Sequence, residues 1–237
     1  MKMKFLSILG AMAVIAVPAT ARAQHQLVLQ KLRMWDSAAP VPPKALLVAE
    51  VMKTAEAIQK ATGGCKPSSV LIESVSAATG VRFVFEGILG GRLKNGWTIV
   101  ANSPNCGSDV ARYTIFQNQD GTYDTIRTNQ GRSHANESLI GDTFPAAILA
   151  AEIALKRAGV SCGNSNPTLG ILRISQEEAD LGPEVFGIRY AGSWSEVWPI
   201  NLCGRTAEVL VRFTADGDGG AYHSLKGDKV KVLSVAT

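Results

Sequence analysis

The sequence predicts an α+β protein of two tandem repeats, each with one helix packed on a four- to five-stranded antiparallel sheet. Three observations support this: four cysteines in two equally spaced pairs, a helix-like segment before each pair, and short strand-like segments after each helix. Because 46% of the residues are hydrophobic and 19% are charged, the chain can form a globular core. This composition excludes a disordered chain.

Residues 1–23 have the pattern of a secretory signal peptide. Lys2 and Lys4 give a positive start, residues 5–17 are apolar, and residues 21–23 read Ala-Arg-Ala, a small-x-small cleavage pattern. The apolar run is shorter than the roughly 20 residues of a transmembrane helix. We therefore expect a periplasmic or secreted protein with no integral membrane segment after signal removal. Cleavage lowers the formal net charge from +4 to +1, which gives no basis for binding nucleic acid.

The cysteine spacing predicts two disulfides. Cys65 and Cys106 lie 41 residues apart, and so do Cys162 and Cys203. An even number of cysteines in an oxidising compartment favours pairing within each repeat, as Cys65–Cys106 and Cys162–Cys203, over pairing between repeats. The sequence has no C-x-x-C pair and no histidine close to a cysteine, so we expect neither a metal site nor a cofactor.

Other similarities support the internal duplication. Each helix-like segment has Glu and Lys four residues apart, and each second cysteine follows a Trp-x-Ile phrase that begins at Trp97 or Trp198. The predicted division of the chain is residues 1–23 signal peptide, 24–43 lead segment, 44–128 first repeat, 129–142 polar linker and 143–237 second repeat.

In each repeat the helix comes first. The first helix spans residues 45–61 and stops at Gly63. The second starts with Asp142 or Thr143 as its cap and has Pro145 in its first turn. The strands expected are residues 70–75, 81–85, 97–101, 111–116 and 122–127 in the first repeat, and 169–175, 185–190, 198–202, 209–214 and a tail near 229–235 in the second.

One helix followed by four or five antiparallel strands is similar to the element order of cystatin-like and NTF2-like rolls. The resemblance is one of element order alone. It implies a helix that covers one face of a sheet, and it implies no functional residue.

A sheet covered on one face leaves the other face open, and alternation predicts its side chains. In the second repeat this places Arg189 and Arg212 outward, with Arg173 near them. These arginines are candidate ligand-binding residues for a carboxylate, a phosphate or an acidic protein surface. The alternative, and the commoner case, is a solvated face with cross-strand charge pairs. In the first repeat the same alternation exposes Glu73, Arg82, Glu86 and Arg112.

Two tryptophans are also candidate ligand-binding residues. Trp194 and Trp198 alternate along one strand and share a face with Tyr190 and Ile200. Such a row forms either an exposed aromatic binding patch or part of the core, and the core is the commoner outcome.

Catalytic candidates are weak. Tyr222 and His223 place a base beside a hydroxyl, but neighbours in a strand point to opposite faces and cannot act together. His134 is expected to be a solvated loop histidine in the linker. The sequence has no G-x-S-x-G, phosphate-loop, dinucleotide-binding or H-E-x-x-H motif.

The function predicted from the sequence is therefore that of an exported, non-enzymatic binding protein. Its partner would be an envelope or secreted protein or a small anionic ligand, held by an open sheet face or between the repeats. Two alternatives stay open: a small exported hydrolase or isomerase with a pocket between helix and sheet, and a protease-inhibitor-like module.

Overall fold

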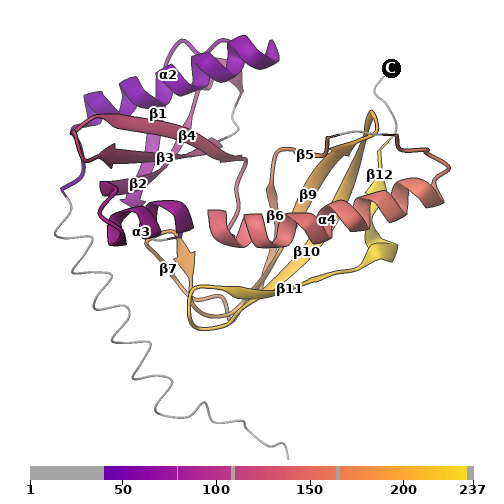
Figure 1. Cartoon of the computed structure of the whole chain (residues 1–237). Helices are drawn as coiled ribbons and strands as arrows, with labels where there is room; N and C mark the ends of the chain where they lie inside the picture. The colour runs from indigo at the N-terminus through magenta and orange to yellow at the C-terminus, as the bar shows by residue number, and fades with distance from the viewer. Residues whose placement is uncertain (1–39, 79, 108–109, 164–165, 234–237) are drawn as a thin grey trace, which may run out of the picture.

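The computed structural model describes residues 40–78, 80–107, 110–163 and 166–233, which form an α+β fold with antiparallel sheets (Figure 1). The predicted signal peptide and nearly all of the predicted lead segment lie outside the described residues. A four-stranded sheet lies against helix α2, and a larger sheet lies behind helix α4 (Figure 1).

The first unit runs from α2 to β4. Its elements are α2 (Lys44–Thr62), β1 (Leu71–Ala77), α3 (Arg82–Leu89), β2 (Leu93–Asn102), the 3-10 turn η1 (Pro104–Cys106), β3 (Val110–Asn118) and β4 (Tyr123–Gln130). The strands pair in chain order, β1-β2-β3-β4. The expected glycine stop is present, because Gly63 has a φ of 72° and its N–H donates to the Gln59 carbonyl.

The second unit runs from α4 to β12. Its elements are α4 (Glu137–Arg157), β5 (Thr168–Leu169), β6 (Arg173–Glu177), β7 (Glu184–Val185), β8 (Ile188–Arg189), β9 (Ser193–Leu202), β10 (Arg205–Ala215), β11 (Ala221–Leu225), the 3-10 turn η2 (Gly227–Lys229) and β12 (Lys231–Val232). β9 and β10 are its central pair, joined by a tight turn in which Cys203 and Gly204 have φ of 56° and 69°. β5 and β6 pair with β9, while β11 and β12 pair with β10.

The second unit has the larger core. Trp194 and Trp198 of β9 are 1% and 0% exposed, and both rings lie against Phe213 of β10, with centroid distances of 5.1 and 5.8 Å. α4 buries seven of its own residues, and its apolar face packs on β9 and β10. α4 is also the one helix in the described ranges that is long and apolar enough to cross a membrane, but it packs here as a core helix does.

Two disulfides are present, and they join the pairs that the spacing favours. Cys65–Cys106 connects the segment after α2 to η1, and Cys162–Cys203 connects the segment after α4 to the β9–β10 turn. Each therefore fastens the end of a long helix to its sheet. The tandem-repeat organisation and the cystatin-like or NTF2-like order stay predictions, and α3 between β1 and β2 is an element that they did not include.

Two of the strand predictions are wrong. Residues 81–85 belong largely to α3, because Val81, Val84 and Ile88 recur at helical spacing and pack in one cluster. Residues 185–190 form the β7–β8 hairpin, since Phe186 and Gly187 have φ of 54° and 76° and turn the chain back. Both runs are short and apolar, and such runs fit several local structures.

The predicted linker, residues 129–142, is also wrong. Its first two residues end β4, and α4 begins at Glu137, capped by the Asn136 side chain, which accepts from the Leu139 N–H at 2.9 Å. Asp142 and Pro145 consequently lie inside the helix. Residues 131–136, here called the connector, are what joins the two units.

The connector is held from both sides in the interior. Arg112 of β3 donates to the carbonyls of Ser133 and Ala135, each at 2.8 Å, and lies 3.6 Å from the carboxylate of Glu137. From the second unit, Glu196 of β9 accepts from the Ser133 hydroxyl and from two backbone N–H groups of the connector, at 2.8 to 3.1 Å. A β-bridge between Gly131 and Leu172 adds backbone hydrogen bonds, so the two units pack as one body.

Candidate functional site

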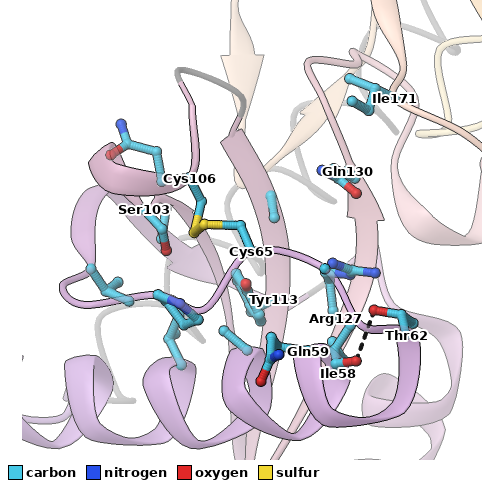
Figure 2. Close-up of a pocket in the computed structure, with 18 residues that line it drawn as sticks. Ile58, Gln59, Thr62, Cys65, Ser103, Cys106, Tyr113, Arg127, Gln130 and Ile171 are labelled. Carbon is cyan, nitrogen blue, oxygen red and sulfur yellow. Dashed lines mark hydrogen bonds between the residues drawn. A yellow bond between two sulfur atoms is a disulfide. The ribbon is translucent and has the colours of Figure 1, made fainter.

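A cavity of about 500 Å³ lies between the C-terminal half of α2 and the first sheet (Figure 2). The sheet contributes residues of β2, β3 and β4, and the disulfide Cys65–Cys106 forms part of the wall. The lining residues are Val51, Ala55, Ile58, Gln59, Thr62, Gly64, Cys65, Pro67, Val70, Ala101, Asn102, Ser103, Cys106, Ala111, Tyr113, Arg127, Gln130 and Ile171. This volume is within the roughly 300–1,000 Å³ of typical small-molecule sites.

The sequence of α2 explains why this space is open. α2 buries just two side chains, Leu47 and Val51, and both lie in its N-terminal half. The next lining positions are the small Ala55 and the polar Gln59 and Thr62, which do not fill the gap to the sheet. The side chains under α4 are large and fully buried instead, so the second unit has a filled core where the first has a cavity.

The wall beside the disulfide is ordered by polar contacts. The Asn105 side chain donates to the Lys66 carbonyl at 2.8 Å and accepts from the Ser68 N–H at 3.0 Å. Together with the Cys65–Cys106 bond, these contacts fix the segment that follows α2. This wall of the cavity is therefore built from covalently tied backbone.

Tyr113 and Arg127 are the polar side chains of the cavity with the clearest chemical roles. They are cross-strand partners on β3 and β4, and both line the cavity (Figure 2). Tyr113 is 5% exposed; burial raises the pKa of its phenol above the usual 10.0, and the positive charge of Arg127 opposes that shift. Arg127 is exposed, so its guanidinium lies at the mouth. The phenol therefore stays a neutral hydrogen-bond donor at neutral pH.

The lining has few ionisable side chains. Arg127 is the one charged side chain among the described lining residues, and none of these is His, Asp or Glu. The two cysteines are joined in a disulfide and cannot act as nucleophiles. In the described ranges no cluster of three or more His, Cys, Asp or Glu side chains is placed to hold a metal ion.

The predicted arginine face is only partly formed. Arg173 and Arg212 lie on the outer face of the second sheet, where Arg173 pairs with Glu208 at 2.6 Å and Arg212 with Glu178 at 3.8 Å. Arg189 is elsewhere, because its strand is part of the β7–β8 hairpin, and it donates to the Gly182 carbonyl at 2.6 Å. The expectation that alternation places Arg189 outward beside Arg212 is wrong.

The two tryptophans do not form an exposed patch. Trp194 and Trp198 are core residues, and their indole N–H groups donate to the two carboxylate oxygens of Glu196, at 2.9 and 2.8 Å. Glu196 itself is 0% exposed. Of the two interpretations left open for the tryptophans, the core is correct.

Two further expectations about exposure are wrong. His134 is buried: Arg189 donates to its Nδ1 at 3.2 Å, which leaves Nε2 to donate to the carboxylate of Glu177. Arg112 is 8% exposed because the outer face of the first sheet is covered by the connector. Alternation along a strand predicts which face of the sheet a side chain lies on. It does not predict whether another part of the protein covers that face.

The weak catalytic candidates do not come together. Tyr222 is 76% exposed on β11, and the neighbouring His223 lies 3.4 Å from the Thr143 hydroxyl of α4. Neither residue lines the α2 cavity. The contact between His223 and Thr143 positions a side chain and supplies no nucleophile–base pair with Tyr222.

Sequence reasoning missed the main features of the cavity. Tyr113 and Arg127 lie in predicted strands, and a polar residue within an otherwise apolar face was the available signal. Their pairing also depends on a β-bulge between Arg112 and Tyr113, which cannot be read from the sequence.

Comparison with protein-family models, with curated proteins and with solved structures gave no match.

Proposed function

We propose that the protein is an exported binding protein that holds a small, partly apolar molecule in the α2 cavity. The observation that carries this proposal is the unfilled space of about 500 Å³ under the C-terminal half of α2, in a chain whose second unit has a filled core. The lining combines apolar side chains such as Val51 and Val70 with polar side chains such as Gln59 and Arg127, which suits a molecule with an apolar part and a polar group.

Export is the second part of the proposal. Two disulfides are typical of proteins from an oxidising compartment. The signal-peptide pattern of residues 1–23 adds a route to the periplasm or to the medium.

The other hypotheses have less support. Binding of an envelope protein through the arginine face would require breaking the ion pairs of Arg173 and Arg212 with their own carboxylates. A hydrolase or isomerase in the cavity would need an acid–base pair, and the described lining residues offer hydroxyls without a histidine or carboxylate beside them. Binding without reaction is what this lining supports best.

The test is a titration of the oxidised protein lacking residues 1–23 with the neutral fluorescent probe N-phenyl-1-naphthylamine. We expect one saturable site. Ala55→Phe, which places a ring in the cavity, should abolish binding. Ala49→Phe is the matched control, because Ala49 is an exposed residue of the same helix that does not line the cavity. If the correctly folded protein shows no saturable site, or if Ala55→Phe binds as well as the unchanged protein, the proposal is wrong.

A further inference from the structure

We propose that the ligand of the α2 cavity is an amphipathic monoanion, an apolar body with one carboxylate, and that Arg127 holds this carboxylate with Tyr113 as a second donor. This inference rests on the proposed function and names the class of molecule bound. Three features of the cavity carry it: one cation without a partner, a neutral donor beside it, and apolar walls beneath them.

Arg127 is a cation without a counter-charge among the residues that the structure describes. No carboxylate of a described residue lies within ion-pair distance of its guanidinium, whereas Arg82, Arg112, Arg132, Arg173 and Arg212 each pair with Asp or Glu. A planar guanidinium binds a carboxylate through two parallel hydrogen bonds. The exposed Arg92 also has no ion pair with a described residue, but Arg127 lines the cavity, so a bound molecule can supply its counter-charge.

Tyr113 supplies a second donor on the same side of the sheet. Its hydroxyl has no hydrogen-bond partner among the described residues, although the residue is almost completely buried. Tyr113 and Arg127 are cross-strand partners on β3 and β4 and both line the cavity (Figure 2), which is why we assign both groups to one anion. Gln130 of β4 adds an amide to the lining of the cavity.

The charge balance indicates a single negative charge. Arg127 is the one charged side chain among the described lining residues, so a carboxylate is neutralised there, whereas a phosphate dianion would leave one charge uncompensated. A cationic headgroup would be repelled by the guanidinium.

The walls determine the rest of the molecule. Val51, Val70 and Ala101 are at most 7% exposed and line the cavity, while Arg127 is exposed at the mouth. An anionic head at the mouth and an apolar body directed inward match this arrangement. A wholly polar ligand, such as a sugar, would leave those apolar walls without a partner.

The experiment compares four probes of equal chain length, decanoate, decanol, decylammonium and decyl phosphate, as competitors of the neutral probe N-phenyl-1-naphthylamine. We expect decanoate to bind about tenfold more tightly than decanol, the size expected of a charge-assisted hydrogen bond at a partly exposed site. Decylammonium and decyl phosphate should both be weaker than decanoate. The preference for decanoate should shrink as salt is added, because the guanidinium is exposed.

Two variants test whether Arg127 and Tyr113 cause the preference for decanoate over decanol. Arg127→Gln should remove the advantage of decanoate while decanol binds unchanged, and Tyr113→Phe should reduce the advantage about threefold. Arg92→Gln is the matched control, an exposed arginine of the same unit that does not line the cavity. It should keep the full preference.

The outcomes separate this inference from the proposed function. If the neutral probe binds and decanol competes as well as decanoate, or if Arg127→Gln keeps the preference, the cavity binds apolar molecules but the anion assignment is wrong. If decyl phosphate binds more tightly than decanoate, the assignment of a monoanionic ligand is wrong. If neither the probe nor any competitor binds, the proposed function and this inference are both wrong.

Discussion

The buried carboxylate of Glu196 offers the sharpest test of how the two units are held together. It accepts five hydrogen bonds: Oε1 from the Trp194 indole and the N–H groups of His134 and Ala135, and Oε2 from the Trp198 indole and the Ser133 hydroxyl. Three of these donors belong to the connector and two to the core of the second unit. Glu196 therefore joins the connector to β9.

Glu196→Gln measures one part of this arrangement. Because three N–H donors need an oxygen at Oε1, the new amide nitrogen takes the Oε2 position and faces the Trp198 indole N–H. The Ser133 hydroxyl can rotate to accept, but the indole cannot. The loss of one charge-assisted hydrogen bond, with a buried donor left unpaired, should lower the free energy of unfolding by about 2–3 kcal/mol.

Glu196→Leu measures the whole arrangement. It leaves all five donors without an acceptor in the interior, and the expected loss is about 4–5 kcal/mol. The assay is urea unfolding of the oxidised protein, followed by tryptophan fluorescence. Glu208→Gln is the control on the same sheet; because Glu208 pairs with an exposed arginine, it should cost less than about 1 kcal/mol. If either Glu196 variant is as stable as this control, the carboxylate does not hold the connector.

Three other predictions concern the backbone, the disulfide and the cavity. Gly131→Ala should lower the free energy of unfolding, measured by thermal unfolding, by more than about 3 kcal/mol, because a Cβ there would lie 2.1 Å from the Leu172 carbonyl oxygen. Gly121 has a similar φ and open space around it, so Gly121→Ala should lower the stability by about 1 kcal/mol. Equal effects of the two substitutions would refute this reasoning. Replacing Cys65 and Cys106 by Ser should cost about 4 kcal/mol in urea unfolding, as expected for a loop of this length, and a change below 1 kcal/mol would contradict it. Burial raises the pKa of the Tyr113 phenol above 10.0, so Tyr113 ionises at a lower pH in the unfolded chain than in the folded protein. The free energy of unfolding is therefore unaffected by this group below pH 10 and falls as the pH rises further. Tyr113→Phe should lose less stability above pH 10 than the unchanged protein, and parallel curves of stability against pH would contradict the assignment.

Local signals in the sequence predicted local structure well. Gly63 ends α2 because the left-handed C-cap needs a residue without a Cβ, and the position is readable from the sequence. The equal cysteine spacing favoured the disulfide pairs that form. Alternation predicted four of the strands in the first unit, because each has one face on the core.

The errors have two physical causes. Asn136 is the true cap of α4, but Pro145 offered a competing start, and a proline is tolerated inside this helix. His134 and Arg112 have the sequence surroundings of exposed residues, and they are buried because the two sheets meet around the connector. Burial of this kind depends on contacts between units, which local periodicity does not contain.

The candidate site was harder to predict than the fold, because the cavity is a space that side chains leave unfilled between α2 and the first sheet. The sequence of α2 shows small and polar residues at positions 55, 59 and 62, but such residues are equally typical of a solvated helix face. In the folded protein they line a cavity, one wall of which the Cys65–Cys106 bond and the Asn105 contacts fix in place.

The two units contribute differently to the protein. The core of the second unit is filled by Trp194, Trp198 and Phe213, while α2 in the first buries two side chains and leaves space beneath its second half. An incompletely filled unit gains less hydrophobic stabilisation. Here its sheet is fixed through Arg112 to the same connector that Glu196 holds, so the filled unit supports the open one. A variant that breaks the connector should therefore weaken binding in the α2 cavity, even though no connector residue lines it.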